Sequence, residues 1–342
     1  MTHDPIDAVI TWVDGGDPKH AAKLNDYLQS IGAKPKGAAS SARFHNAGEI
    51  DYCVTSILKY APWIRTIYIV TDDQQPELMN QIQGGCLESR VRIVDHSVIF
   101  AGYEHYLPTF NSNAILALLW RIPGLSEQFV FFNDDFFLVN PVRPEDFFCE
   151  GKPVLRGKWY LMQEYLPHKW LRNKIFSLMG SKKQDTRLPG HRISQEIAAG
   201  WAGFKGRYFR LPHVPHAWQR STLANFYDAN PHVLQINIET KLRSHNQYIV
   251  EALAAHLEIK ANKAVFDKVA HNVHLKPGEQ SYRRIRAKLK KADNDPQVLF
   301  ACVQSIETAS EKKQKMVFSW LDKRIGSLDA LVSCHASTVN LD

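Results

Sequence analysis

Hydrophobic and polar positions along the first 150 residues predict short strands separated by helices. Apolar residues recur with helical spacing from Glu49 to Tyr60, and Ala61-Pro62 ends that helix. A second helix is predicted from Asn113 to Arg121, with Asn111 or Ser112 as its N-cap. β-Branched and aromatic runs that end in polar residues predict four strands, at Asp7 to Val13, Thr66 to Thr71, Val91 to Val94 and Gln128 to Phe132.

The second half of the chain is less regular. Helices are predicted from Trp170 to Met179, from Gln247 to Leu257 and from Tyr282 to Lys291. Prolines interrupt residues Leu211 to Arg220, which are therefore predicted to form a loop. Because no stretch has the composition of a linker, we expect one domain over residues 1–260. A helical extension over residues 261–342 is expected to pack on it or next to it.

Strands that alternate with helices predict an α/β fold with a mainly parallel sheet flanked by helices. In such sheets, ligands bind outside the carboxyl ends of the strands. Neither a Gly-x-Gly-x-x-Gly motif nor a P-loop is present, which disfavours dinucleotide and P-loop nucleotide sites. The residues that follow the four strands are acidic or polar, and we expect them to converge: Asp14, Asp72, Asp95 and Asn133-Asp134-Asp135.

The composition is that of a globular protein, since 44% of the residues are hydrophobic and 23% are charged. The longest apolar run, Ala114 to Trp120, is too short to span a bilayer. The N-terminus lacks the basic and apolar regions of a signal peptide, so we expect a soluble protein of the cytosol. Five scattered cysteines without a CxxC pair predict reduced thiols rather than disulfides or a zinc site: Cys53, Cys86, Cys149, Cys302 and Cys334.

The formal net charge is +7, and the excess is concentrated in residues Tyr282 to Lys291. A basic balance suits phosphate-rich ligands, acidic polymers, nucleic acid or an anionic membrane surface. No nucleic-acid-binding motif is present, so nucleic acid is disfavoured as a partner. The basic helices predicted at 170–179 and 282–291 are either solvated faces or contacts with an anionic membrane or product. The expected location is the cytosol, free or at the inner face of the plasma membrane.

Three groups of residues are candidates for chemistry. A buried carboxylate is costly, so Asp134 or Asp135 is expected to face a cleft, where the pair would bind a divalent cation or supply a base. The alternative is that both cap the next turn. His213 and His216 suit a base, a phosphate ligand or a metal ligand, or else belong to an ordinary surface loop. Arg243 would neutralise phosphoryl charge or be solvated.

Several segments resemble the conserved blocks of the Stealth proteins. Asp7 to Pro18 resembles the first block. The second is matched by Arg43-Phe44, Glu49, Tyr60 to Asp72, Leu107 to Ile115, Arg121 to Ser126 and Phe132 to Asp135. The third is matched by His213 to His216 and Lys241 to Arg243, whereas the fourth, near Val298 to Ile325, is faint. The resemblance extends over residues 7–255 and is most specific over the first 150.

The Stealth family includes bacterial capsule hexose-1-phosphate transferases and the eukaryotic enzyme that makes the mannose 6-phosphate tag. The resemblance implies a glycosyltransferase-A-like nucleotide-binding fold, a UDP-sugar donor, usually a UDP-N-acetylhexosamine, and Mg²⁺. It implies transfer of a sugar 1-phosphate to a hydroxyl of an oligosaccharide or capsule polymer, with release of UMP. The basic helices are then candidate contacts for capsule assembly proteins or the inner membrane surface.

Carried over residue by residue, the resemblance makes Asp135, His213, His216 and Arg243 catalytic. It also makes Asp134 and Asp135 ligands of the metal. The residues assigned to donor binding are Thr11, Trp12, Val13, Asp14, Gly15, Arg43, Asn111, Asn113 and Asn133.

Two positions depart from the family pattern. Asp51 stands where the family often has arginine. An acidic residue commonly follows Ala-Ile in the Asn-Ser-Asn-Ala-Ile segment, and Leu116 stands there in this chain. Two other functions remain open from the sequence. One is an ordinary glycosyltransferase that moves the sugar alone and releases UDP. The other is a polysaccharide-binding or scaffold protein without catalysis.

Overall fold

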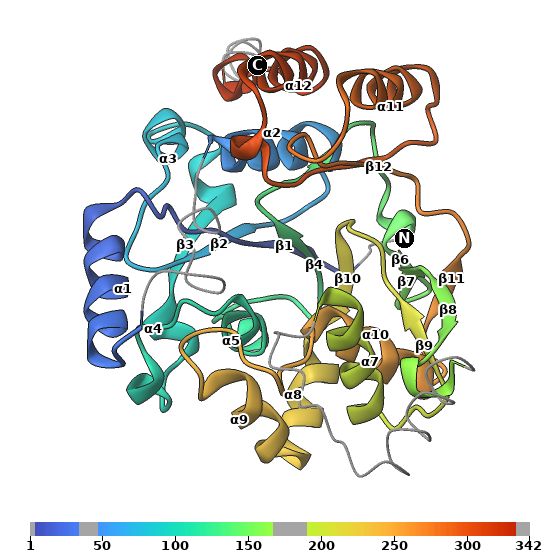
Figure 1. Cartoon of the computed structure of the whole chain (residues 1–342). Helices are drawn as coiled ribbons and strands as arrows, with labels where there is room; N and C mark the ends of the chain where they lie inside the picture. The colour runs from blue at the N-terminus through green and yellow to red at the C-terminus, as the bar shows by residue number, and fades with distance from the viewer. Residues whose placement is uncertain (1–3, 34–46, 167–189, 333–342) are drawn as a thin grey trace.

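The computed structural model describes residues 4–33, 47–166 and 190–332 (Figure 1). Its main sheet has the strand order β10-β4-β1-β2-β3. Four of its strands run parallel to one another: β1 (Ile6–Thr11), β2 (Ile67–Thr71), β3 (Val91–Asp95) and β4 (Gln128–Asn133). Strand β10 (His216–Gln219) joins the edge of β4 in the antiparallel direction. The predicted α/β fold with a mainly parallel sheet is confirmed.

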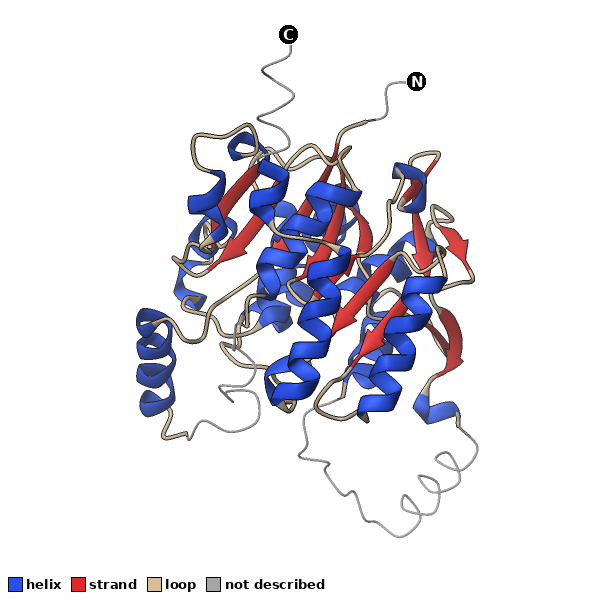
Figure 2. Cartoon of the chain, turned by 90° about the horizontal axis from the view of Figure 1, so that it is seen from above, coloured by secondary structure: helices blue, strands red, loops and turns tan. Residues whose placement is uncertain are grey.

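Helices cover both faces of this sheet (Figures 1 and 2). Helix α2 (Glu49–Tyr60) shares one apolar core with Ala8 and Ile10 of β1. Helices α5 (Ser112–Leu116) and α10 (Val250–Lys260) share a second core with Val9. Because successive strand residues point to opposite faces, a strand covered on both sides must be apolar throughout. This is why the strands appear as continuous apolar runs in the sequence.

The remaining elements surround this centre. Further helices before residue 260 in the described ranges are α1 (Pro18–Ser30), α3 (Leu78–Ile82), α4 (His96–Ile99), α7 (His191–Trp201), α8 (Arg220–Ala229) and α9 (Pro231–Ile238). Strands β6 (Phe148–Cys149), β7 (Lys152–Arg156) and β11 (Val265–Asp267) form a small sheet, and β8 (Lys158–Leu161) pairs with β9 (Arg207–Arg210). The predicted helix from Trp170 to Met179 lies outside the described residues.

Two predictions of local structure need correction. The predicted helix Asn113 to Arg121 is shorter, because α5 ends at Leu116 and a separate 3₁₀ turn follows at Leu119–Arg121. Its N-cap is Asn111, whose side chain accepts the Asn113 N–H. The predicted loop Leu211 to Arg220 is wrong at its end, where β10 forms. Trp218 of β10 is buried against Phe129 and Phe131, and this packing, with the open edge of β4, outweighs the nearby prolines.

The C-terminal segment is mixed rather than helical. Strands β12 (Asn272–Leu275) and β13 (Phe300–Val303) form a sheet with β5 (Phe136–Leu138). Helix α11 (Tyr282–Asn294) confirms the predicted helix, and α12 (Glu311–Arg324) was not predicted. The described part of the expected helical extension therefore contains strands as well as helices, because β13 pairs with β5, and a division near residue 260 stays a prediction. Within the described ranges, no helix is long and apolar enough to cross a membrane.

His256 gives a pH-dependent test of the core that supports the site. Its Nε2 accepts the Phe209 N–H at 2.9 Å and its Nδ1 lies 2.6 Å from the Ala252 carbonyl oxygen, so the neutral ring links α10 to β9. Burial lowers the pKa of His256 from 6.5 to about 4. A histidine whose pKa is lower in the folded state stabilises the fold above pH 6.5, and this contribution is lost as pH falls towards 4.

The variant His256→Gln should therefore lose less stability than the wild type between pH 7.5 and 4.5. The expected difference is roughly 2 kcal/mol in the free energy of unfolding, because one pKa unit corresponds to about 1.4 kcal/mol. Urea unfolding at the two pH values measures it. The exposed His105→Gln serves as control and should follow the wild type. An identical pH dependence in His256→Gln and wild type would contradict the assignment.

Candidate active site

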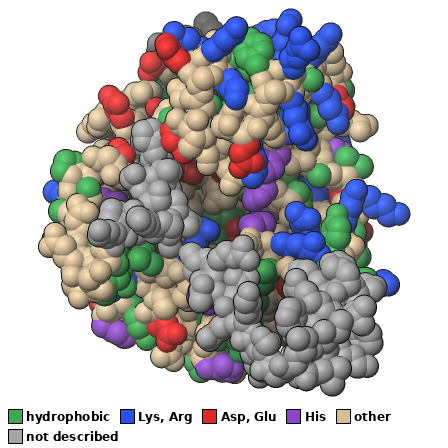
Figure 3. All heavy atoms as spheres, viewed as in Figure 1, with side chains coloured by type: hydrophobic (Ala, Val, Ile, Leu, Met, Phe, Trp, Pro, Cys, Tyr) green, Lys and Arg blue, Asp and Glu red, His purple; other side chains and the backbone are tan. Residues whose placement is uncertain are grey.

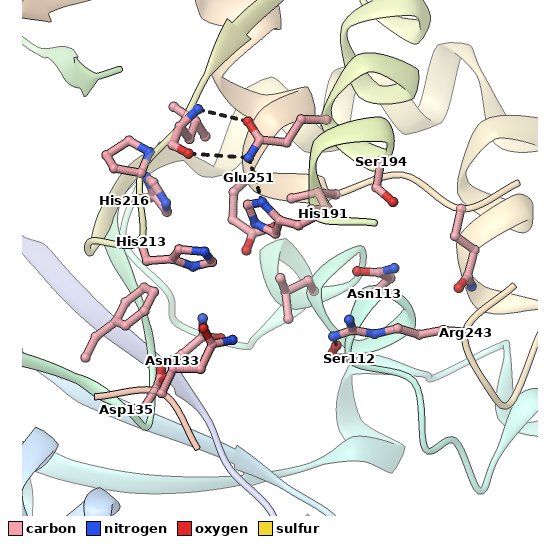
Figure 4. A pocket seen from close by; sticks show the side chains of 18 of the residues that line it. Ser112, Asn113, Asn133, Asp135, His191, Ser194, His213, His216, Arg243 and Glu251 are labelled. Atoms are coloured by element: carbon pink, nitrogen blue, oxygen red, sulfur yellow. Dashed lines mark hydrogen bonds between the residues drawn. The ribbon is translucent and has the colours of Figure 1, made fainter. Parts of the chain in front are cut away.

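Two cavities meet at the carboxyl edge of the main sheet. The larger, about 570 Å³, borders the end of β1 at Thr11, Trp12 and Val13. The smaller, about 210 Å³, lies between the turn that follows β4, helices α7 and α10, and the segment before β10. The side chains around the smaller cavity come from distant parts of the chain (Figure 4). Five residues line both cavities: Ser112, Asn133, Asp135, Arg243 and Gln304.

Asp134 and Asp135 form the tight turn between β4 and β5. Strand β13 holds this turn, since the Val303 N–H donates to the Asp135 carbonyl at 3.1 Å and the Cys302 Sγ donates to its carboxylate at 3.7 Å. Burial raises the pKa of Asp135 to about 7. Burial, and then the neighbouring Asp135 and Glu49, raise the pKa of Asp134 well above its usual range. The turn therefore concentrates acidic groups whose charges are poorly compensated.

The donor type of this turn fits a divalent cation. Asp134, Asp135, Glu49 and Glu307 all line the larger cavity and offer hard oxygen atoms. Within the described ranges, no group of three or more His, Cys, Asp or Glu side chains is arranged to hold a metal ion. Mg²⁺ is usually held by one or two carboxylates together with water and substrate phosphate oxygens. The aspartate pair suits that mode, in which the ligand completes the site.

The wall of the larger cavity contains buried polar atoms that lack hydrogen-bond partners among the described residues. They are Trp12 Nε1, Thr109 Oγ1 and both ring nitrogens of His96. Burial lowers the pKa of His96 to about 4, so its ring is neutral. An unpaired buried polar group costs about 1–3 kcal/mol, and such groups are rare unless a ligand or water completes them. Of these three residues, the sequence assigned only Trp12 to the site.

Histidines gather around the smaller cavity and are visible beside the hollow in the face shown in Figure 3. The ring of His213 lies between those of His191 and His274, with centroid distances of 4.6 and 4.7 Å. His216, at the start of β10, also lines the cavity. Burial lowers the pKa of His213 and His216 to about 3 and that of His191 to about 4, so all three are neutral. His191 and His274 were missed because no sequence pattern distinguishes them.

Gln195 of α7 fixes the histidine-bearing segment. Its side-chain oxygen accepts the Leu211 N–H at 2.8 Å. Its amide nitrogen lies 3.4 Å from the Leu211 carbonyl oxygen and 3.1 Å from His191 Nδ1 (Figure 4). Because Gln195 is fully buried, these bonds hold the approach to His213 in one position.

Arg243 reaches both cavities because its segment is tied to α5. The Arg243 Nη2 donates to Ser112 Oγ at 2.6 Å. The Asn111 amide donates to the Thr240 carbonyl oxygen at 2.9 Å, and the Phe110 N–H donates to the Lys241 carbonyl oxygen at 2.9 Å. Asn111 is fully buried and also caps α5, so the structure gives it a positioning role rather than a place in the cavity wall.

The other acidic strand ends have structural partners. Asp14 accepts the Gly16 N–H at 2.8 Å and closes the turn after β1. Burial would raise the pKa of Asp72, but bonds from His20 and Lys23 lower it to about 2. Asp95 caps α4 by accepting the Ser97 N–H at 2.9 Å. The strand ends thus share one edge, as predicted, but of these four strand ends only the one after β4 brings carboxylates into the cavities.

Some of the residues assigned from the sequence to binding of the UDP-sugar donor line the cavities, and others do not. Neither Asp14 nor Gly15 lines the two cavities, and Arg43 lies outside the described residues. Asn113 lines the smaller cavity. The assigned residues that line the larger cavity are Thr11, Trp12, Val13 and Asn133.

Comparison with protein families gives two matches. Residues 4–32 match Stealth protein CR1, conserved region 1, and residues 43–154 match Stealth protein CR2, conserved region 2. Among solved structures, the chain is similar to the glycosyltransferase GlyE of Streptococcus pneumoniae, with a TM-score of 0.44 and 9% identity over 99% of this chain and 65% of that one. It is also similar to the galactosyltransferase LgtC, with a TM-score of 0.42 and 10% identity over 87% of each chain.

Relatives by sequence are closer. The capsular polysaccharide phosphotransferase cps1A of Actinobacillus pleuropneumoniae is 42% identical over 144 residues, which are 42% of this chain and only 38% of that relative's length. The receptor polysaccharide phosphotransferase WefC of Streptococcus oralis is 41% identical over 260 residues, which are 70% of this chain and 74% of WefC. The chain therefore belongs to the Stealth family.

Proposed function

We propose that this chain is a sugar-1-phosphate transferase that uses a UDP-sugar, a UDP-N-acetylhexosamine, to build a phosphodiester-linked capsular polysaccharide. The relatives cps1A and WefC carry the name polysaccharide phosphotransferase, which supports this class of reaction. The observation that carries the proposal is the junction of the two cavities at Asp135 and Arg243. A donor in one cavity and an acceptor in the other would meet between a carboxylate and a guanidinium group.

The larger cavity suits the nucleotide half of the donor. Its volume, about 570 Å³, is within the range of small-molecule sites. Unpaired polar atoms of Trp12, His96 and Thr109 offer hydrogen bonds to the base and ribose. Asp134 and Asp135 would hold Mg²⁺ against the diphosphate, where the ion would neutralise phosphate charge. The smaller cavity, with its neutral histidines, would then receive the acceptor sugar.

In the proposed reaction, an acceptor hydroxyl oxygen attacks the phosphorus that carries the sugar. The bond from this phosphorus to the bridging oxygen breaks, and UMP leaves with that oxygen. Asp135 or His216 takes the hydroxyl proton, and the higher pKa of Asp135 makes it the stronger base. Arg243, oriented by Ser112, faces the phosphoryl oxygens. Positioning and charge stabilisation supply most of the acceleration in phosphoryl transfer.

The product would be an anionic polymer, and the protein offers a cationic surface for it. Helix α11 buries Ile285, Leu289 and Ala292 and exposes a basic face. Lysine and arginine side chains gather over this part of the molecule in Figure 3. Attraction of a polyanion to such a face would be screened by salt. The exposed basic residues are Arg283, Arg284, Arg286, Lys290 and Lys291.

The decisive test follows the β-phosphorus of the donor. Incubation with UDP-N-acetylhexosamine labelled with ³²P at the β position, together with a capsule oligosaccharide, should place the label in the polymer and release UMP. Thin-layer chromatography of the nucleotide and scintillation counting of the polymer measure both. Release of UDP with an unlabelled polymer would identify an ordinary glycosyltransferase and refute the proposal.

Thr109→Val tests whether the unpaired atoms serve a ligand. The substitution removes an unpaired buried hydroxyl at nearly constant shape, so the free energy of unfolding should be unchanged or higher. The Kd for UDP should rise about tenfold, which corresponds to a loss of roughly 1.4 kcal/mol in binding free energy. Thr222→Val is the matched control. Its hydroxyl donates to Glu258, so stability should fall by about 1–3 kcal/mol with UDP binding unchanged. Urea unfolding measures the stability of each variant, and calorimetry measures its UDP binding. Equal destabilisation by both substitutions would argue against a ligand role for the Thr109 hydroxyl.

Asp135→Asn separates an enzyme from a binding protein. The variant should fold, and it should still bind UDP in the absence of Mg²⁺, because Asp135 is proposed to contact the diphosphate only through the ion. Its turnover should fall by about 10²–10⁴-fold, which is the effect of losing a general base. The exposed Asp26→Asn on α1 should keep full activity. Rates of label transfer and the thermal midpoint of unfolding are compared for both. Undiminished transfer by a well-folded Asp135→Asn would exclude this carboxylate from catalysis.

A further inference from the structure

The smaller cavity contains a second carboxyl group that the proposed reaction does not use. Glu251 is the second residue of α10 and lines the cavity together with His191, His213 and His216. In Figure 4 it lies beside His191, away from Arg243 and Ser112. Asp135 and Glu251 are the two carboxyl groups among the described residues that line this cavity, and Asp135 also faces the larger one. Glu251 is therefore the carboxyl group at the acceptor end.

The N-terminus of α10 favours an acidic residue in its first turn, but it does not satisfy both oxygen atoms of the Glu251 carboxyl group. The Glu251 Oε2 atom is buried and has no hydrogen-bond partner among the described residues. Burial raises the pKa of Glu251 to about 7, and its own backbone N–H and then Arg243 offset this only in part. A buried carboxyl oxygen without a hydrogen-bond partner costs about 1–3 kcal/mol, which exceeds the roughly 0.3–1 kcal/mol that an acidic residue gains at a helix N-terminus. An orphaned oxygen that faces a cavity indicates a ligand that completes its hydrogen bonding.

Leu116, on the helix α5 side of the same cavity, is apolar. It stands where the sequence comparison expected an acidic residue, and it lines the same cavity as Glu251. Leu116 is 4% exposed and packs in the core around α5 and α10. The cavity thus keeps a carboxyl group although the residue on α5 is apolar, because α10 supplies one from another wall.

We propose that Glu251 is the acceptor-binding carboxylate of this site, which accepts a hydrogen bond from a hydroxyl of the acceptor sugar and so orients it towards the junction. A carboxylate suits this ligand class, because charge-assisted bonds to hydroxyl groups are short and strong. The histidines, all neutral, would supply further bonds to the same sugar. This inference rests on the proposed function for the identity of the ligand, but the binding itself can be measured without turnover.

The test uses the full chain with UMP present and saturation-transfer difference NMR. The probes are the methyl glycosides of glucose, galactose and N-acetylglucosamine. For the glycoside that the wild type binds, Glu251→Ala should raise the Kd about tenfold, which corresponds to roughly 1.4 kcal/mol of binding free energy. Glu251→Gln keeps the shape and a neutral acceptor, so its loss should be smaller. Glu239→Ala, at an exposed position outside both cavities, is the control and should bind like the wild type.

Kinetics give a second readout if the wild type transfers label. Glu251→Ala should then raise the acceptor KM about tenfold while the donor KM stays within about twofold. Wild-type binding by both Glu251 variants, an equal loss in Glu239→Ala, or no binding of any glycoside by the wild type would each overturn the inference. Sugar binding that depends on Glu251 in a protein that transfers no label would uphold the subsite and refute only the proposed reaction.

Discussion

The site depends on strand β4, which is hydrogen-bonded along both of its edges. Parallel pairing with β1 aligns Thr11 with Asn133, and antiparallel pairing with β10 aligns Phe131 with His216. A slip of one residue would turn every side chain of β4 to the opposite face, which the apolar cores on both sides resist. The register therefore fixes Asp134 and Asp135 at the sheet edge and brings His216 to the same place.

The turn after β4 is also held from its far side. It leads into β5, which pairs with β13, a strand that lies more than 160 residues further along the chain. Cys302 contacts the Asp135 carboxylate, and Gln304 lines both cavities. The C-terminal segment is consequently part of the site rather than an appendage to it. Its loss would leave the aspartate turn without support on one side.

Burial moves the pKa values of the acidic and basic groups of the site in opposite directions, because in each case it disfavours the charged form. It raises the pKa of Asp135 and Glu251 to about 7 and lowers that of His213 and His216 to about 3. These groups, with the unpaired atoms of the larger cavity, cost stability that the surrounding cores must supply. The gathering of such groups around two cavities at one edge of the sheet is typical of a binding site.

The sequence by itself determined the α/β architecture, because strands buried on both faces must be apolar and their polar ends are then conspicuous. It also identified Asp135, His213, His216 and Arg243, which do line the cavities. Only the tertiary structure distinguished the cavity-lining Asp134 and Asp135 from Asp72 and Asp95, because all four lie at strand ends. Lys23 donates a hydrogen bond to Asp72, and the Ser97 N–H donates one to Asp95. Likewise, His96, His191 and Glu251 became site residues only through contacts between distant segments, which local periodicity does not encode.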